Sequence, residues 1–148
     1  MIKKYRWVLI FALIVLVGIF LFFYRLYQHD LKALGDFMSS YQKFDIAISD
    51  FQGASVTDDI KRTADAALGE LSAKASVRIS SVIKHDGDVM STEREIADVS
   101  KKELDALISY KKAVQENRAV DSDRLAKEFS DLHAKRITEY AYFQALGK

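Results

Sequence analysis

The pattern of apolar and polar positions divides the chain into one uninterrupted apolar run followed by four periodic segments. The run covers residues 7–24, reads WVLIFALIVLVGIFLFFY, and is bounded by Arg6 and Arg25. A helix of this length, at about 1.5 Å per residue, spans about 27 Å, which is close to the hydrocarbon thickness of a bilayer. Because apolar side chains occupy every face, a soluble domain would have to surround the segment completely. The run therefore predicts a transmembrane helix over residues 7–26.

Charged residues on either side of the run predict its orientation. The first six residues hold three basic side chains, whereas Arg25 and Lys32, which follow the run, are interleaved with Asp30 and Asp36. Positive charge concentrates on the cytoplasmic side of membrane helices. We therefore expect residues 1–6 to form a cytoplasmic tail in the cell (inner or plasma) membrane, with residues 27–148 on the periplasmic or other extracytoplasmic side.

A cleaved secretory signal is the alternative interpretation of the same run. Such a signal has a shorter apolar stretch, with small residues close behind it. The nearest small residues are Ala33-Leu34-Gly35, about ten residues beyond the run and past Arg25 and Asp30. We therefore expect an uncleaved signal anchor and a single-pass membrane protein.

The periodic segments predict helices at about 27–52, 57–85, 92–118 and 122–146. In the first, apolar residues recur at alternating steps of three and four, as in a coiled-coil helix with one packed seam. The candidate packing or interaction seam consists of Leu34, Phe37, Tyr41, Phe44, Ile48 and Phe51. Nothing between Tyr24 and Leu31 breaks a helix, so we expect this helix to continue directly out of the membrane. Gly53 marks its end.

The second predicted helix has a start signal and one ambiguous stretch. Thr57 or Ser55 can cap its first turn, and apolar residues from Ile60 to Val82 mark one face. Residues 77–79, Val-Arg-Ile, alternate like a strand. Because the alternation covers only three residues, we expect this stretch to remain helical, with the break at residues 85–88.

The third and fourth predicted helices begin with capping signals. Thr92 and Glu95 have the spacing of a capping box. Asp121 can cap the fourth helix, and Val120 and Leu125 are spaced as a hydrophobic staple. The expected inner face of the fourth helix consists of Leu125, Phe129, Leu132, Arg136, Ile137, Tyr140 and Phe143.

Short connections between these segments predict an all-α fold, in which a single N-terminal transmembrane helix continues into an antiparallel up-down four-helix bundle. The connections near Gly53 and Val120 then lie far from the bilayer, and the C-terminus returns to it. Aromatic residues at the headgroup level are favourable. The candidate membrane-surface contacts are Trp7, Tyr24, Tyr27, Tyr140, Tyr142 and Phe143. For those near the C-terminus, ordinary packing in the bundle core is the alternative.

Composition supports the helical interpretation and narrows the chemistry. The chain has no proline and only six glycines, as expected of long helices. It has no cysteine, which excludes disulfides, thiol chemistry and c-type haem attachment. All 21 acidic residues but only 19 of the 22 basic ones follow the apolar run, so the remainder has a net charge of −2. With both signs mixed along every segment, we expect no nucleic-acid partner.

Motifs that carry chemistry are scarce. The three histidines, His29, His85 and His133, share no i, i+4 spacing and complete no Glu-x-x-His pair, so we expect no metal site. Asp86-Gly87-Asp88 begins like a calcium loop but lacks that loop's later glycine and acidic residue. No phosphate-binding loop or nucleophile elbow is present in the sequence. We therefore expect no cofactor and no enzymatic activity.

Two functional hypotheses remain. The first is a structural or assembly subunit of a membrane complex, which contacts a protein partner or a second copy through its helices. This hypothesis is favoured because the recognisable features all concern packing.

The second hypothesis is an extracytoplasmic sensor or ligand-binding module. The layout resembles the periplasmic ligand-binding domains of bacterial chemoreceptors, in which the first bundle helix continues out of the first membrane span. The resemblance covers the anchor and the bundle and includes no shared motif. The sequence ends at Gly147-Lys148 without a second apolar run. We therefore expect this chain not to signal across the membrane by itself.

Overall fold

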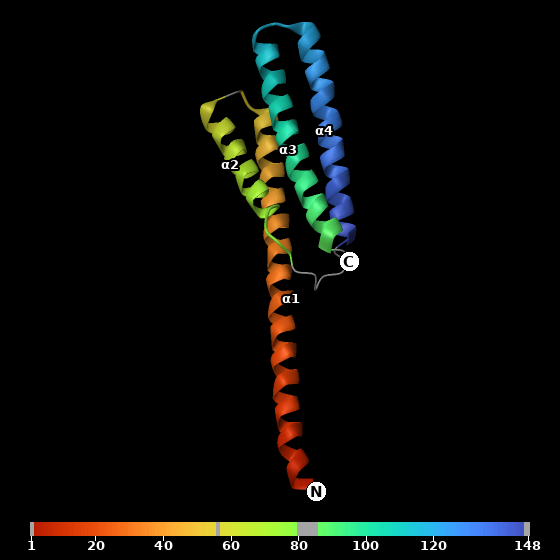
Figure 1. Cartoon of the computed structure of the whole chain (residues 1–148). Helices are drawn as coiled ribbons and strands as arrows, with labels where there is room; N and C mark the ends of the chain where they lie inside the picture. Colours follow the sequence, from red (N-terminus) through yellow and green to blue (C-terminus); the bar gives the residue numbers. More distant parts are fainter. Residues whose placement is uncertain (1, 56, 80–85, 147–148) are drawn as a thin grey trace.

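Four α-helices form the computed structural model, which describes residues 2–55, 57–79 and 86–146. They are α1 (Ile2–Gly53), α2 (Asp58–Lys74), α3 (Asp86–Gln115) and α4 (Ala119–Leu146). Figure 1 shows α1 as one long rod, with the other three helices gathered along its C-terminal half. Successive helices run in opposite directions. The predicted all-α, antiparallel up-down architecture is therefore confirmed.

The long helix α1 joins the apolar run to the bundle without interruption, as predicted. At about 1.5 Å per residue its 52 residues extend for about 78 Å. Among the described residues, α1 is the one helix long and apolar enough to cross a membrane, and none of its most apolar window is buried within the chain. Trp7 is 76% exposed and Phe11 is 70% exposed. The apolar half of α1 therefore has no packing partner inside this molecule.

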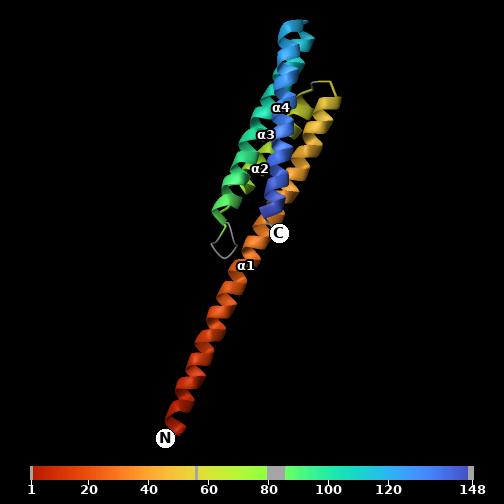
Figure 2. The ribbon, with the colours of Figure 1, turned by 90° about the vertical axis from the view of Figure 1, so that its right-hand side faces the viewer.

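The connections between helices and the C-terminus lie at the ends of the bundle that an antiparallel order of helices requires. The α1–α2 and α3–α4 connections lie at the end far from the N-terminus, and the C-terminal end of α4 returns beside the middle of α1 (Figures 1 and 2). Both views also show the α3–α4 hairpin extending beyond the end of α1.

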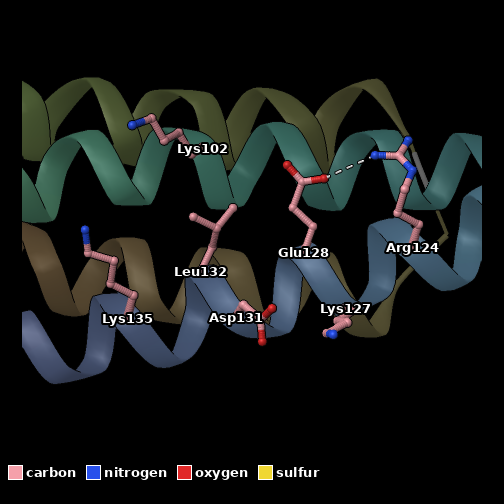
Figure 3. Close-up of a pocket in the computed structure, with 7 residues that line it drawn as sticks. All are labelled: Lys102, Arg124, Lys127, Glu128, Asp131, Leu132 and Lys135. Carbon is pink, nitrogen blue, oxygen red and sulfur yellow. Dashed lines mark ion pairs between the residues drawn. The ribbon is translucent and has the colours of Figure 1, made fainter.

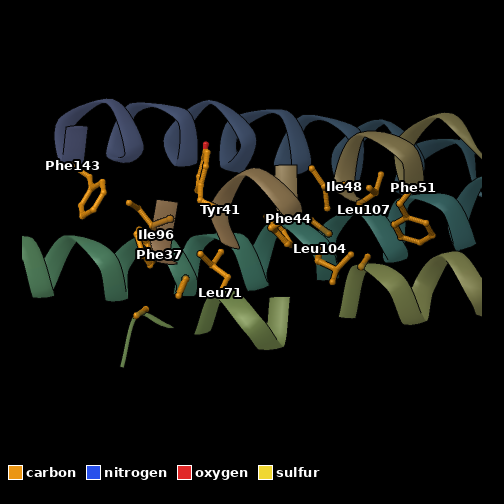
Figure 4. Packing of buried hydrophobic residues seen from close by; sticks show 14 of the residues in the cluster. Phe37, Tyr41, Phe44, Ile48, Phe51, Leu71, Ile96, Leu104, Leu107 and Phe143 are labelled. Atoms are coloured by element: carbon orange, nitrogen blue, oxygen red, sulfur yellow. The ribbon is translucent and has the colours of Figure 1, made fainter. Parts of the chain in front are cut away.

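The core is built between two hairpins. Helices α1 and α2 pack closely, as do α3 and α4, whereas no Cα atom of α1 lies within 8 Å of one in α4 among the described residues. Large side chains bridge this wider gap. The ring of Phe37 meets that of Phe143 edge-on at 5.0 Å between centroids, and Tyr41 stacks on Tyr140 at 3.6 Å. Figure 4 shows side chains from all four helices converging on this shared interior.

The second helix is shorter than predicted. Helix α2 ends at Lys74, and residues 75–79, including the strand-like stretch 77–79, are not helical. The backbone N–H groups of Ser76 and Val77 bond three residues back rather than four, which tightens the last turn. The chain then leaves the helix and buries Ile79 in the core. Ile79 therefore joins the core from non-helical backbone. The rest of the predicted segment, residues 80–85, lies outside the described residues.

The predicted starts of the third and fourth helices are also wrong. Helix α3 begins at Asp86, six residues before Thr92, and the early start includes Val89, which is buried in the core. Thr92 is consequently buried within the helix, where its hydroxyl donates to the Asp88 carbonyl at 2.7 Å, and it caps nothing. Helix α4 begins at Ala119, after a left-handed residue at Asn117 (φ 55°). Val120 is 86% exposed and forms no hydrophobic staple.

Candidate functional site

A fully buried ion pair lies between α3 and α4. Arg136 and Glu103 both have 0% exposed side chains, and Nε of the arginine donates to Oε2 of the glutamate at 2.5 Å. Burial disfavours the charged guanidinium, but Glu103, Tyr41 and Asp45 together outweigh this effect and hold the pKa of Arg136 above its usual value. Each ion therefore depends on the other for its place in the core.

Asp45 and His133 extend this pair to the surface. Nη2 of Arg136 donates to Oδ1 of Asp45 on α1 at 2.7 Å, and Nδ1 of His133 lies 2.6 Å from Oε1 of Glu103. The Asp45 side chain is 51% exposed and that of His133 is 38% exposed. We call Asp45, Glu103, His133 and Arg136 the charge cluster. It joins three helices and connects the two hairpins.

Aromatic rings enclose the guanidinium of Arg136. Its central carbon lies 5.1 Å from the ring centroid of Tyr41 and 5.4 Å from that of Phe44, within the range of cation–π attraction. Burial raises the pKa of Tyr41 to about 12, so the phenol stays neutral beside the cluster. The ring of Tyr140 stacks on that of Tyr41.

A cleft opens beside the charge cluster where α1 ends. Its volume is about 300 Å³, and it is lined by Gln52, Leu107, Tyr110, Ala126, Phe129, Ser130 and His133. The imidazole of His133 lies nearly parallel to the Phe129 ring, 5.9 Å away. Lys111 ties this end of α1 to α3, because its ammonium donates to the carbonyls of Gln52 at 3.0 Å and Ala54 at 2.5 Å.

A second, more open groove follows the outer side of the α3–α4 pair (Figure 3). Its lining is mixed in charge and consists of Lys102, Arg124, Lys127, Glu128, Asp131, Leu132 and Lys135. Several of these cations are paired: Figure 3 shows Glu128 reaching toward Arg124, and Lys102 and Lys135 pair with Asp98 and Glu95. The groove is therefore a solvated, mixed-charge surface.

The predicted seam of the first helix lies inside the molecule. Its five C-terminal members are buried in the core, and Leu34 is partly buried against it. The seam is therefore used for packing within the chain, and self-association along Phe37, Phe44 and Phe51 would require the bundle to open.

The candidate membrane-surface residues divide into two groups. Trp7, Tyr24, Tyr27 and Tyr142 are exposed. Phe143 is buried against Phe37, and Tyr140 is partly buried in its stack with Tyr41, so the alternative of packing in the bundle core describes these two. Heptad spacing on α4 places them on the core face.

The predicted inner face of the fourth helix is largely correct. Leu125, Phe129, Arg136 and Phe143 are buried, whereas Ile137 is about half exposed. Of the histidines, His29 has its Nδ1 atom 3.4 Å from Oδ1 of Asp30, and His85 lies outside the described residues. Within the described part of the chain, no group of three acidic or histidine side chains is placed to hold a metal ion.

Sequence reasoning missed the charge cluster. It placed Arg136 on the inner face of the fourth helix but did not identify its partners Glu103 and Asp45. A signal was available, because Glu103 falls within the apolar face of its helix, next to Leu104 and four residues before Leu107. Asp45 gave no signal, since an exposed acidic residue is ordinary on a bundle helix. Comparison with models of protein families, with curated proteins and with solved structures found no match to this chain.

Proposed function

We propose that this protein is a non-enzymatic, membrane-anchored structural or assembly subunit that acts outside the cytoplasm through helix–helix contacts. The observation that carries the proposal is the apolar half of α1. It is long enough to cross a bilayer, is unpacked within the chain, and continues as one helix into the bundle. A rigid helical connection holds a bundle at a fixed height above the membrane, as an assembly subunit requires.

The surface that a partner can contact is found by setting aside the surfaces that already pack within the chain. The apolar seam of α1 is occupied by the chain's own core, whereas the exposed residues 10–24 form a continuous apolar surface that is available for contacts. Helices within a bilayer associate by packing and hydrogen bonding rather than by the hydrophobic effect. The proposed contacts are therefore made first between membrane spans, with the bundle defining the spacing outside.

Cross-linking and sizing of the full chain in mild detergent test the proposal. A stable homo-oligomer or a co-purifying membrane protein is expected. A chain that remains monomeric and without a partner after extraction from its own membrane would contradict the assembly role.

The orientation is tested separately, because the chain has no cysteine and a single one can be introduced. A cysteine at Ser122 should react with a membrane-impermeant reagent in intact cells, whereas one at Lys4 should react only after lysis. The reverse result would place the bundle in the cytoplasm.

The cleft beside His133 favours a second candidate function, an extracytoplasmic ligand-binding module. Mixed apolar and polar lining is typical of small-molecule sites. A monomeric chain whose melting temperature rises with a ligand would support this candidate over assembly.

A further inference from the structure

Large side chains fill most of the gap between α1 and α4, two helices whose described Cα atoms stay more than 8 Å apart. Each helix contributes one member to every pair: Phe37 with Phe143, Tyr41 with Tyr140, and Asp45 with Arg136. In the two ring pairs the centroids lie 5.0 and 3.6 Å apart, so one ring from each side spans the gap. The chain therefore closes two of these three levels of the gap with aromatic rings.

The same gap is left open where α1 ends. Here α1 contributes Gln52, seven residues after Asp45, and α4 contributes only the short side chains of Ala126 and Ser130. The cleft of about 300 Å³ lies at this level, and its volume is at the small end of the range for ligand sites. A molecule of one ring with a short polar arm fits this size better than a peptide or a large cofactor.

Aromatic rings also form much of the cleft wall. Tyr110 of α3 and both Phe129 and His133 of α4 line it, and the buried Leu107 adds a further apolar surface. The rings of Phe129 and His133 lie 5.9 Å apart between centroids, at an interplanar angle of 28°. Aromatic rings attract one another in offset-stacked or edge-to-face arrangements, which contribute beyond the area that they bury. The wall therefore favours a ring over a saturated group of similar size.

The polar lining groups suit a hydroxyl or an amide. The side chains of Gln52, Ser130 and Tyr110 can each donate and accept a hydrogen bond, and none of them is charged. An ion placed against uncharged groups loses more hydration than a hydroxyl or an amide does. The charged side chains that bond at this end of the bundle are two of each sign: Asp45, Glu103, Lys111 and Arg136. The lining therefore matches an uncharged arm.

We infer that this cleft binds a small aromatic molecule that consists of one ring and a hydroxyl or amide arm. The ring continues the row of rings that fills the gap between α1 and α4, and it packs against Phe129 and Tyr110. The arm exchanges hydrogen bonds with Gln52 and Ser130. The inference rests on the second candidate function, for which it names the ligand class, and the assembly role does not depend on it because a monomer or an oligomer can bind.

The test uses the full chain in detergent micelles and compares benzamide with cyclohexanecarboxamide, its saturated counterpart. Backbone amide shifts of cleft residues in NMR titrations report each dissociation constant, after correction for uptake of the probe by protein-free micelles. Benzamide should bind with a dissociation constant of about 1 mM or lower, and at least about threefold more tightly than the saturated probe. Sizing of the same samples reports assembly separately, so a failure of ligand binding is distinguished from a failure to assemble.

Two charged probes test the arm. Benzoate and benzylammonium keep the ring of benzamide but carry a negative or a positive charge next to it. Each should bind at least about threefold more weakly than benzamide, because the lining offers uncharged donors and acceptors.

Variants locate the binding and test the ring contact. Ala126→Phe places a ring of the chain itself in the cleft and should weaken benzamide binding about tenfold or more, whereas Ala141→Phe, at an exposed position of the same helix, should leave it unchanged. Ser130→Tyr, at the rim, replaces Ala126→Phe if that variant loses helical content. Phe129→Leu keeps an apolar wall without the ring and should reduce the preference for benzamide over cyclohexanecarboxamide.

Three results would overturn the inference. The first is a saturated or charged probe that binds as tightly as benzamide. The second is unchanged benzamide affinity in the folded cleft-filling variant. The third is the absence of saturable benzamide binding at about 10 mM, since a specific site for a molecule of this size should reach about millimolar affinity.

Discussion

Arg136 occupies a heptad position of α4, seven residues after Phe129 and seven before Phe143, where an apolar side chain would be ordinary. A buried ion pair of this kind contributes little net stability over an apolar pair of similar volume, because two ions lose their hydration. Removing one ion alone is costly, since the other remains buried without a partner. At the residue scale, the pair therefore specifies how α3 and α4 pack within their hairpin more than it stabilises them, and the bond from Arg136 to Asp45 joins this hairpin to α1.

This argument predicts the effect of Arg136→Met. The change leaves the Glu103 carboxylate buried without its guanidinium and should cost about 3–5 kcal/mol of unfolding free energy in urea titrations followed by circular dichroism. Lys135→Met, which removes an exposed pair with Glu95, should cost less than about 1 kcal/mol. The double variant Arg136→Met, Glu103→Leu should recover most of the loss. A double variant as unstable as the single one would contradict the argument.

Glu93 is a second buried carboxyl on α3, and burial raises its pKa to about 7, opposed by the neighbouring charge of Arg94. The folded state therefore holds this proton more tightly than the unfolded state, where the pKa is near 4.5. The stability that results is fully present below about pH 4.5 and is lost as the pH rises through about 7.

Glu93→Gln should remove this pH dependence. At pH 8 we expect the variant to exceed the wild type by about 1–3 kcal/mol, and at pH 4.5 the two should converge. Urea titrations across this range measure the difference, with the exposed Glu95→Gln as the control. Parallel pH profiles for wild type and Glu93→Gln would show that the carboxyl is solvated or paired in the folded protein.

At the scale of elements, helix existence followed from local pattern, but helix ends did not. The seam of α1 and the core face of α4 could be predicted from the sequence because a helix repeats its contacts every three to four residues. Helix α2 ends before Ile79 and α3 begins before Val89, and both of these side chains are buried in the core. The capping pattern formed by Thr92 and Glu95 lies inside α3 and does not mark its start.

Helix α2 is the shortest of the four and carries an exposed glycine in its interior. A Cβ atom added at Gly69 meets nothing within 4 Å, so Gly69→Ala gains helix propensity without a clash. We expect stabilisation of about 0.5–1 kcal/mol in urea titrations. Ala66→Gly, at another exposed position of α2, should cost a similar amount. If both changes shift stability in the same direction, propensity does not govern this helix.

At the scale of the whole molecule, the bundle and the apolar half of α1 are structurally independent. Described apolar core residues begin at Phe37, and the exposed side chains of residues 10–24 make no contribution to that core. The continuous helix couples the two parts mechanically, while the bundle's packing is complete without the span.

Deleting residues 1–26 should therefore yield a bundle that stays in solution without detergent. We expect the helical content of residues 27–148 and a melting temperature within a few degrees of that of the full chain, because few of the core contacts are lost. Circular dichroism and size-exclusion chromatography measure both. An aggregated or unfolded fragment would show that the span or the membrane contributes to folding of the bundle.

Periodicity and composition by themselves determined the helical class, the apolar span and its continuity with the first bundle helix, because these depend on neighbours within a few turns. Tertiary structure alone decided that Arg136 pairs with Glu103 and Asp45, that Tyr140 stacks on Tyr41, and that a cleft lies where α1 ends. Those contacts join residues 30 or more positions apart, and their geometry depends on how α3 packs on α4 and on how the two hairpins meet across a gap filled by large side chains. A local pattern can place such residues on the core face, but it does not identify their partners.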